Sequence, residues 1–358
     1  MKIKYMGEVN SERYIWKNKK INILDNGEIL LSDISQEIDN YYHLKQFLRF
    51  NNSHPVYIVK PSFLISPYNF DILAKYIYAK DRLLKLNSKF AKQVYLKHIK
   101  AFNNYKEPDG SKHNKSDYLN NFNTMIDYLI KKNCMRKTFI PVSSQFLIID
   151  GSHRTALSLL AKQDINCLCF DTVDLKFDFY FFKHRKLKSV YLDYMAFHYK
   201  EILPHIGCSI HKYDTISELN KIVDDVYQNN DVFYFKKRSI NTENLKKIIP
   251  LPEGTGEENY IMFICQNITD NKADFTTNNS NEIELLFNLF LNDNSVKFFN
   301  KLSTNRIDKL LKKIKENDLV KNNLYSLEHS EITILKDDIK ISTNPTKHLY
   351  FANIMIKK

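Results

Sequence analysis

One stretch of the chain decides the fold: residues 138–170, which read TFIPVSSQFLIIDGSHRTALSLLAKQDINCLCF. Two short apolar runs, at 138–142 and 146–149, predict strands with a tight turn between them. Gly151 follows at the point where a strand passes into a helix. The apolar side of that helix is formed by Ala156, Leu157, Leu160 and Ala161. Residues 165–170 then predict a further strand that closes the unit.

The turn at Gly151 has the composition of an anion site. The whole chain contains only seven glycines, and this one precedes a helix, whose first N–H groups and positive dipole end attract negative charge. Ser152, His153 and Arg154 add a hydroxyl, an imidazole and a guanidinium, and arginine can bind phosphate oxygens in pairs. We therefore predict nucleotide or phosphate binding at Gly151, Ser152, His153, Arg154 and Thr155.

An ordinary turn is the alternative to an anion site. A cation is unfavourable at a helix N-terminus, so Arg154 needs a negative partner, which a bound anion would provide. A nearby carboxylate would serve equally well, with Asp150 as the N-cap of the helix.

The order of elements resembles the core of the ParB and sulfiredoxin-like fold. It runs helix (119–133), strand, strand, Asp-Gly-Ser-His-Arg, helix and strand, and the resemblance covers residues 116–171. The sulfiredoxins carry cysteine at the place of Ser152, so sulfinic acid reduction is not expected here. The DNA-partition ParB proteins have other residues after the glycine, and no helix-turn-helix is evident downstream.

The closest branch is that of the ParB-like free-serine kinases. Their Asp-Gly-His-His-Arg motif matches Asp150, Gly151, His153 and Arg154, with one change at Ser152. Proteins of surface-polysaccharide biosynthesis with an Asp-Gly-Ser-His-Arg motif also look similar.

This resemblance implies a kinase or phosphotransferase that uses ATP or another nucleotide, with Mg²⁺, to phosphorylate a hydroxyl of a sugar or amino-acid-like metabolite. It assigns Asp150 to orient or deprotonate the acceptor hydroxyl, and Ser152, His153 and Arg154 to hold the phosphates. Neither GxxxxGK[ST] nor GxGxxG occurs in the chain, which excludes a P-loop or a Rossmann nucleotide site.

Other candidate residues lie outside the motif. Glu107, in a polar loop at 106–116 that also contains Asp109, is predicted as a second catalytic carboxylate beside Asp150 and His153. Lys60 and Lys75 are predicted to contact an anionic substrate. The alternative for each is a solvated surface charge.

The fold class predicted for the chain is α+β. We expect an N-terminal α/β extension at 1–115, with two helices over 69–103, and the ParB/sulfiredoxin-like core at 116–175. The helix at 119–133 has Ser116 or Asp117 as its expected N-cap. A mostly helical extension at 176–249 and a separate C-terminal α/β region at 250–358 follow. In the latter, helices are expected at 283–291 and 307–314 and strands at 332–341.

Composition leaves a rival function open. The net charge of +12 and the combination of aromatic and basic residues at 179–186 would suit a ParB-like DNA-binding protein or nuclease. However, the positive charge is spread along the chain, and a core segment followed by a basic turn explains 179–186 equally well.

Composition also bears on the cellular compartment. Five cysteines without a CxxC pair suit a reducing compartment, and neither a signal peptide nor a membrane span is evident, so we expect a cytoplasmic protein.

Overall fold

The computed structural model describes residues 23–30, 53–108, 110–132, 139–171, 175–203, 205–246, 249–251, 256–266, 268 and 272–292. The chain divides into two compact units, which meet in the sequence at Lys188 and Ser189. Each unit contains a four-stranded sheet and several helices, so the predicted α+β class is confirmed. None of the described helices is long and apolar enough to cross a membrane.

The sheet of the first unit has the order β1-β2-β4-β3. Its strands are β1 (Ile23–Leu30), β2 (Ser53–Val59), β3 (Ile140–Ser143) and β4 (Ile165–Phe170). β4 lies between β2, which runs antiparallel to it, and β3, which runs parallel to it. Because β3 and β4 are parallel, the chain needs a crossover between them, and α7 (Ser152–Ala161) provides it.

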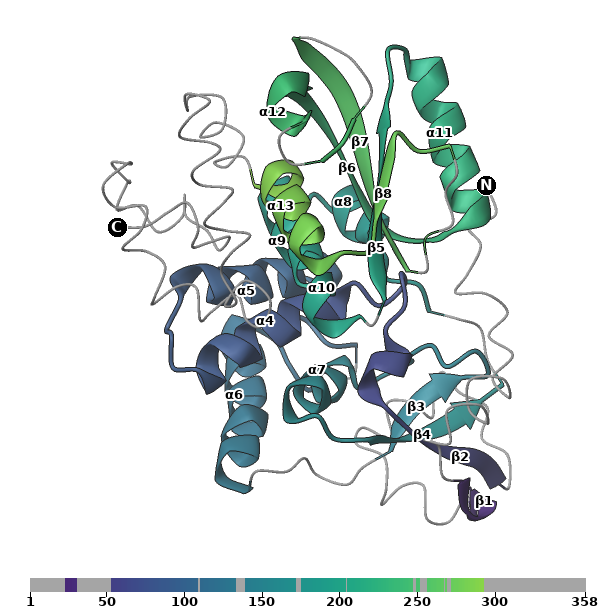
Figure 1. Cartoon of the computed structure of the whole chain (residues 1–358). Coiled ribbons are helices and arrows are strands. Elements are labelled where there is room, and N and C mark those ends of the chain that lie inside the picture. The colour runs from purple at the N-terminus through teal and green to yellow at the C-terminus, as the bar shows by residue number, and fades with distance from the viewer. Residues whose placement is uncertain are drawn as a thin grey trace. The chain divides into compact units, whose positions relative to one another are not determined.

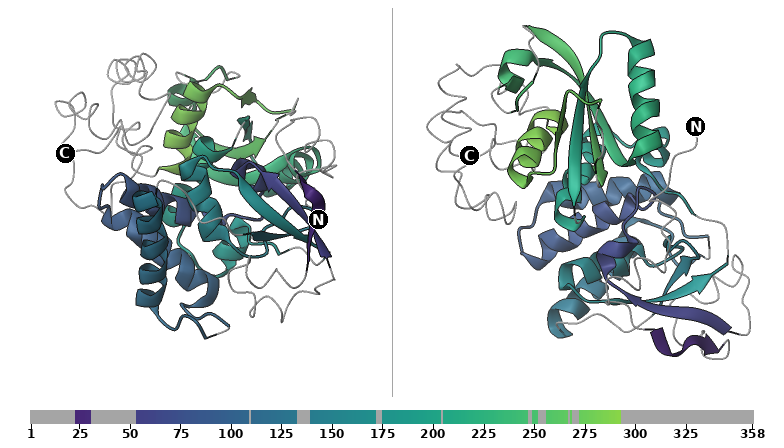
Figure 2. Two further views of the ribbon diagram at one scale, coloured as in Figure 1. Left: turned by 90° about the horizontal axis from the view of Figure 1, so that it is seen from below. Right: turned by 45° about the vertical axis from the view of Figure 1, so that its right-hand side comes forward.

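The helices of this unit gather on one side of the sheet (Figures 1 and 2). They include α4 (Asp71–Leu83), α5 (Lys89–Asn103) and α6 (Lys115–Lys132), followed after β4 by α8 (Phe179–His184). A short 3₁₀ turn, η1 (Pro61–Leu64), precedes α4. The two helices expected over 69–103 are therefore confirmed.

The N-cap of α6 differs from the expectation of Ser116 or Asp117. The side chain of Asn114 accepts the N–H groups of both residues, at 2.8 and 3.2 Å. Asp117 in turn accepts the N–H groups of His113 and Asn114. Asp117 thus has the reciprocal role of a capping box, three residues inside the cap.

A single aromatic-rich core joins α7 to the other helices. Tyr78 of α4, Tyr95 of α5 and Phe122 of α6 are all buried in this core, and Leu157 of α7 is fully buried against them. The helix that follows the Gly151 turn therefore packs in one core with α4, α5 and α6, and this packing fixes its position.

The second unit is built on an antiparallel sheet with the order β6-β7-β5-β8. Its elements are α9 (Ser189–Phe197), α10 (Tyr199–Ile202), β5 (Ile206–Lys212), α11 (Ile216–Asn229), β6 (Asp231–Asn241), α12 (Thr242–Lys246), β7 (Glu257–Gln266), β8 (Phe275–Thr277) and α13 (Ser280–Leu291). In Figure 1, α11 lies on one side of these strands, and α9 and α13 lie on the other.

The predicted four-part division differs from these two units. β2 pairs with β4, so 1–115 and 116–175 share one sheet. β6 pairs with β7 along its length, so the expected boundary at 249/250 separates neighbouring strands of one sheet. The region 176–249 contains β5 and β6 in addition to its helices. The helix expected at 283–291 is confirmed within α13. The elements expected at 307–314 and 332–341 lie outside the described residues.

Candidate functional site

The turn that delivers Asp150 and Gly151 to α7 begins at the end of β3. The strand expected at 146–149 is wrong: only Ile148 forms a bridge there, to Val142. Ser143 explains the short pairing, because its hydroxyl accepts the N–H groups of Gln145 and Leu147 and closes a tight turn. The chain then doubles back along β3, with the N–H of Ile149 donating to the carbonyl of Pro141 at 3.0 Å.

Gly151 opens α7 in a conformation that favours glycine. Its φ is 101°, and a Cβ built there would lie 3.0 Å from Nη2 of Arg154 and 3.2 Å from Ile140. No side chain caps α7, so the alternative in which Asp150 is the N-cap does not hold. Thr155 is fully buried, and its hydroxyl donates to the carbonyl of Gly151 at 3.2 Å, which withdraws it from any ligand.

Arg154 points into the protein. Its side chain is 7% exposed and donates to the carbonyl of Phe139 at 3.0 Å. A second N–H of the guanidinium donates to the carboxylate of Asp150 at 3.4 Å, and the side chain of Asp150 is 35% exposed. This is the pairing that the ordinary-turn alternative expects. Its consequence is that Arg154 orients Asp150 and supports the turn.

His153 lies between two aromatic rings. Its Nε2 is 3.0 Å from the hydroxyl of Tyr95, and its ring meets the ring of Phe122 edge-on at 4.5 Å. Burial holds the pKa of His153 well below its usual range, and the charges of Lys75, Lys112, His98 and Arg154 act in the same direction. His153 is therefore a neutral imidazole at neutral pH.

Lys75, predicted from the sequence, does lie close enough to act on His153. It forms a buried ion pair with Asp71 one helical turn earlier, with 6% and 2% of the two side chains exposed. Burial alone would raise the pKa of Asp71, but Lys75, His98 and the hydroxyl of Ser152 together lower it, so Asp71 stays ionised.

The sequence did not lead us to predict Asp71 as a residue of the site. The available signal was the spacing Asp71 to Lys75 within a helix whose intervening residues are all apolar, because such a helix buries every side.

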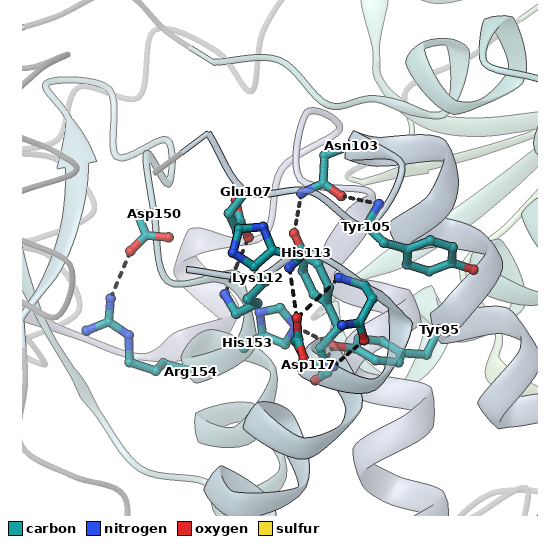
Figure 3. A network of polar contacts seen from close by, with 12 residues as sticks. Tyr95, Asn103, Tyr105, Glu107, Lys112, His113, Asp117, Asp150, His153 and Arg154 are labelled. Atoms are coloured by element: carbon teal, nitrogen blue, oxygen red, sulfur yellow. Dashed lines mark hydrogen bonds and ion pairs between the residues drawn. The ribbon is translucent and has the colours of Figure 1, made fainter. Parts of the chain in front are cut away.

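The loop before α6 brings a further acid and a further cation to the site (Figure 3). Glu107 and Lys112 form an ion pair at 3.4 Å, and Nζ of Lys112 lies 5.0 Å from the centre of the Tyr118 ring. Burial raises the pKa of Tyr95 well above its usual value, and the charges of neighbouring tyrosines and Glu107 add to this effect. Glu107 thus lies near the Tyr95–His153 contact, whereas Asp109 lies outside the described residues.

Lys60 is held elsewhere. Its ammonium pairs with Asp164 at 2.6 Å, and both side chains are more than a third exposed, at 47% and 36%. That is the arrangement of a solvated surface pair, so the structure gives no support to Lys60 as a substrate residue.

The charged side chains at this site form ion pairs, and such pairs are suited to binding and orienting a charged ligand. Three acid–cation pairs, Asp71–Lys75, Glu107–Lys112 and Asp150–Arg154, come from α4, from the loop before α6 and from the start of α7. Among the described residues, no group of three or more His, Cys, Asp or Glu side chains could hold a metal ion.

The aromatic and basic stretch at 179–186 forms part of the core. Phe179 and Phe182 are buried, at 4% and 0% exposure. Arg185 donates to the carbonyls of Ala101 and Phe102 at the end of α5, and its guanidinium lies 4.2 Å from the centre of the Phe181 ring. These contacts withdraw Phe179 and Phe182 from stacking on nucleic-acid bases, whereas the basic residues at 183–186 are exposed.

Comparison with known proteins does not identify a family for this chain. No family model matches the chain, and neither a curated protein nor a solved structure matches it.

Proposed function

We propose that the protein is a nucleotide-dependent phosphotransferase, with ATP or another nucleotide as donor and a hydroxyl of a sugar or amino-acid-like metabolite as acceptor. The phosphates bind at the first turn of α7. The acceptor class rests on the resemblance of the Asp150–Arg154 motif to the free-serine kinases.

One observation carries the proposal: three cations, each paired with an acid that a phosphate could replace, surround an uncapped helix N-terminus. Lys75, Lys112 and Arg154 all lower the pKa of His153, the second residue of α7. The helix begins at Gly151 without a side-chain cap, so its N–H groups and dipole add to the same positive field. A phosphate group is the ligand that such a field favours.

Asp150 is the residue best placed to meet an acceptor. Its carboxylate is partly exposed and is held on one side by Arg154, which leaves other lone pairs to accept a proton. In the proposed step, the acceptor hydroxyl gives its proton to Asp150 while its oxygen forms a bond to the terminal phosphorus. The bond from that phosphorus to the bridging oxygen breaks, and the nucleoside diphosphate leaves.

Mg²⁺ enters this proposal as the ion carried by the nucleotide phosphates. Nucleotide sites bind it through one or two carboxylates together with phosphate oxygens, so a cage made of protein alone is not needed.

Purified protein would be tested with ATP, Mg²⁺ and a panel of sugars, sugar nucleotides and serine-like acceptors. We expect turnover that depends on an acceptor, and its loss in Asp150→Asn. Asp164→Asn is the matched control, because Asp164 is equally exposed and also pairs with a cation, Lys60. Absence of nucleotide binding by calorimetry, together with absence of acceptor-dependent turnover, would refute the proposal.

DNA binding is the less favoured alternative. Its structural motivation was the stretch at 179–186, whose phenylalanines at 179 and 182 are buried and whose Arg185 caps α5.

A further inference from the structure

The contact between Tyr95 and His153 determines what His153 can do. Tyr95 is fully buried in α5, and its ring stacks on that of Tyr78 with centroids 5.0 Å apart. Phe122 packs against both Tyr95 and His153, at centroid distances of 5.2 and 4.5 Å. The phenol is therefore rigidly placed when its hydroxyl meets Nε2 of His153 at 3.0 Å.

The hydroxyl of Tyr95 has one proton and two acceptors within reach. Because burial raises its pKa well above the usual value, the phenol stays protonated. One acceptor is Nε2 of His153 at 3.0 Å, and the other is the carbonyl of Tyr118 at 3.4 Å. A separation of 3.4 Å is long for an O–H···O bond, which is usually about 2.5–3.0 Å.

The carbonyl of Tyr118 also has little need of a second donor. It lies inside α6, where a helical carbonyl accepts the N–H group four residues later, here that of Phe122. An imidazole nitrogen without a proton has no such internal partner. The phenol therefore donates to His153.

The hydrogen bond from the Tyr95 hydroxyl to Nε2 determines the tautomer of His153. A neutral imidazole that accepts at Nε2 carries its proton at Nδ1. The charges that face the ring are those of Lys75 on α4, Lys112 in the loop before α6 and Arg154 on α7, with His98 of α5 nearby, and all four oppose a second proton.

We propose that Tyr95 is a positioning residue that locks His153 in the Nδ1–H form, and that His153 donates this hydrogen bond to a phosphate oxygen of the ligand. The choice of ligand rests on the proposed function, whereas the tautomer does not. His153 then acts as a neutral donor. It serves as neither the general base nor a cation, and Asp150 remains the proton acceptor of the proposed step.

Nuclear magnetic resonance of the full chain with ¹⁵N-labelled histidine tests the tautomer directly. The His153 signals are assigned by their loss in His153→Gln. At neutral pH we expect a protonated Nδ1 and an unprotonated Nε2. A protonated Nε2, or an imidazolium, in the original protein would overturn the inference.

A titration with inorganic phosphate tests the donor role. We expect the Nδ1 resonance of His153 to shift and saturate, with affinity about tenfold weaker in Tyr95→Phe, the usual consequence of losing one oriented hydrogen bond. Tyr78→Phe is the control, because it removes the hydroxyl of the neighbouring ring, which bonds to Asn123. It should leave both the tautomer and the affinity unchanged.

The two proposals fail in different ways. If phosphate leaves His153 unperturbed, or if Tyr95→Phe binds phosphate as tightly as the original protein, the donor role is overturned. If phosphate shifts Nδ1 as expected but no nucleotide turnover is found with any acceptor, the phosphotransferase proposal fails and the inference about His153 stands.

Discussion

Replacing Gly151 with alanine probes the turn on which the site depends. The residue has a φ of 101°, which an L-amino acid with a side chain rarely adopts. A methyl group there would also lie 3.0 Å from Nη2 of Arg154 and 3.2–3.3 Å from two carbons of Ile140. Backbone strain and crowding therefore act together at this position.

The expected loss of stability follows from these two contributions. Positive φ costs an alanine about 1–2 kcal/mol, of which roughly 0.4–1 kcal/mol is offset because alanine restricts the unfolded chain more than glycine does. Crowding in a well-packed site adds about 1–3 kcal/mol. We expect Gly151→Ala to lower the free energy of unfolding by about 1–4.5 kcal/mol.

Gly110→Ala separates strain from crowding within the same unit. Gly110 also has positive φ, 73°, but a methyl group there would meet only His113, at an ordinary 3.7 Å. We expect a loss of about 1 kcal/mol or less for this variant. The assay is hydrogen exchange at increasing urea, followed by mass spectrometry of peptides from α7, because two units can unfold separately. Equal losses for the two variants would refute the claim that Ile140 and Arg154 crowd position 151.

Three further predictions concern charged residues of the first unit. Lys75→Met should destabilise the fold by about 3–5 kcal/mol in urea unfolding because it leaves the buried Asp71 unpaired, and Asp71→Asn in the same chain should recover part of that loss. Arg154→Ala should cost about 1.5–3 kcal/mol of stability, measured in the same way, since the guanidinium bonds to the carbonyl of Phe139 inside the protein. Burial raises the pKa of Asp81 to about 6, so the native state binds a proton that the unfolded state releases, and this carboxyl lowers stability as pH rises from about 4 through 6. Asp81→Asn should remove that slope, with a gain at pH 7 relative to pH 4 of up to about 3 kcal/mol in urea titrations.

The sequence predicts those features of the fold that depend on local pattern. The helical spacing in 69–103 and the apolar run at 165–170 correspond to α4, α5 and β4, because periodicity and burial agree in these segments. The run at 146–149 has equal apolar character and is not a strand. There the hydroxyl of Ser143 closes a tight turn, and the run pairs with β3 only through the Val142–Ile148 bridge and its two flanking backbone hydrogen bonds. Hydrophobic pattern does not encode this effect.

At the candidate site, too, the sequence predicts the local features and not those that depend on distant residues. Local chemistry predicted the glycine turn, since Gly151 has the positive φ that its position suggested. It could not predict which way Arg154 points, because that depends on the carbonyl of Phe139, fifteen residues earlier. Nor could it show that Asp71 and Tyr95 lie at the start of α7, because they come from α4 and α5 and reach α7 only through the packing of the helices.

Lys112 is the cation whose removal best distinguishes a binding site from a self-contained cluster. The other two cations, Lys75 and Arg154, are nearly buried, at 6% and 7% exposure. Their removal would lower the stability of the protein as well as its affinity for the ligand. Lys112 is 17% exposed, and its pair with Glu107 is long, at 3.4 Å, so a phosphate could replace that carboxylate at little cost.

Lys112→Met should therefore leave the unfolding transition nearly unchanged and weaken ATP binding by about 1.5–3 kcal/mol in calorimetry, with a smaller dependence on salt. Lys60→Met serves as the control, because that exposed lysine is paired with Asp164 and should affect neither quantity. If both variants bind ATP as the original protein does, the acid and the cation of each pair serve only to stabilise the fold. The positive field at the start of α7 would then have no ligand to attract.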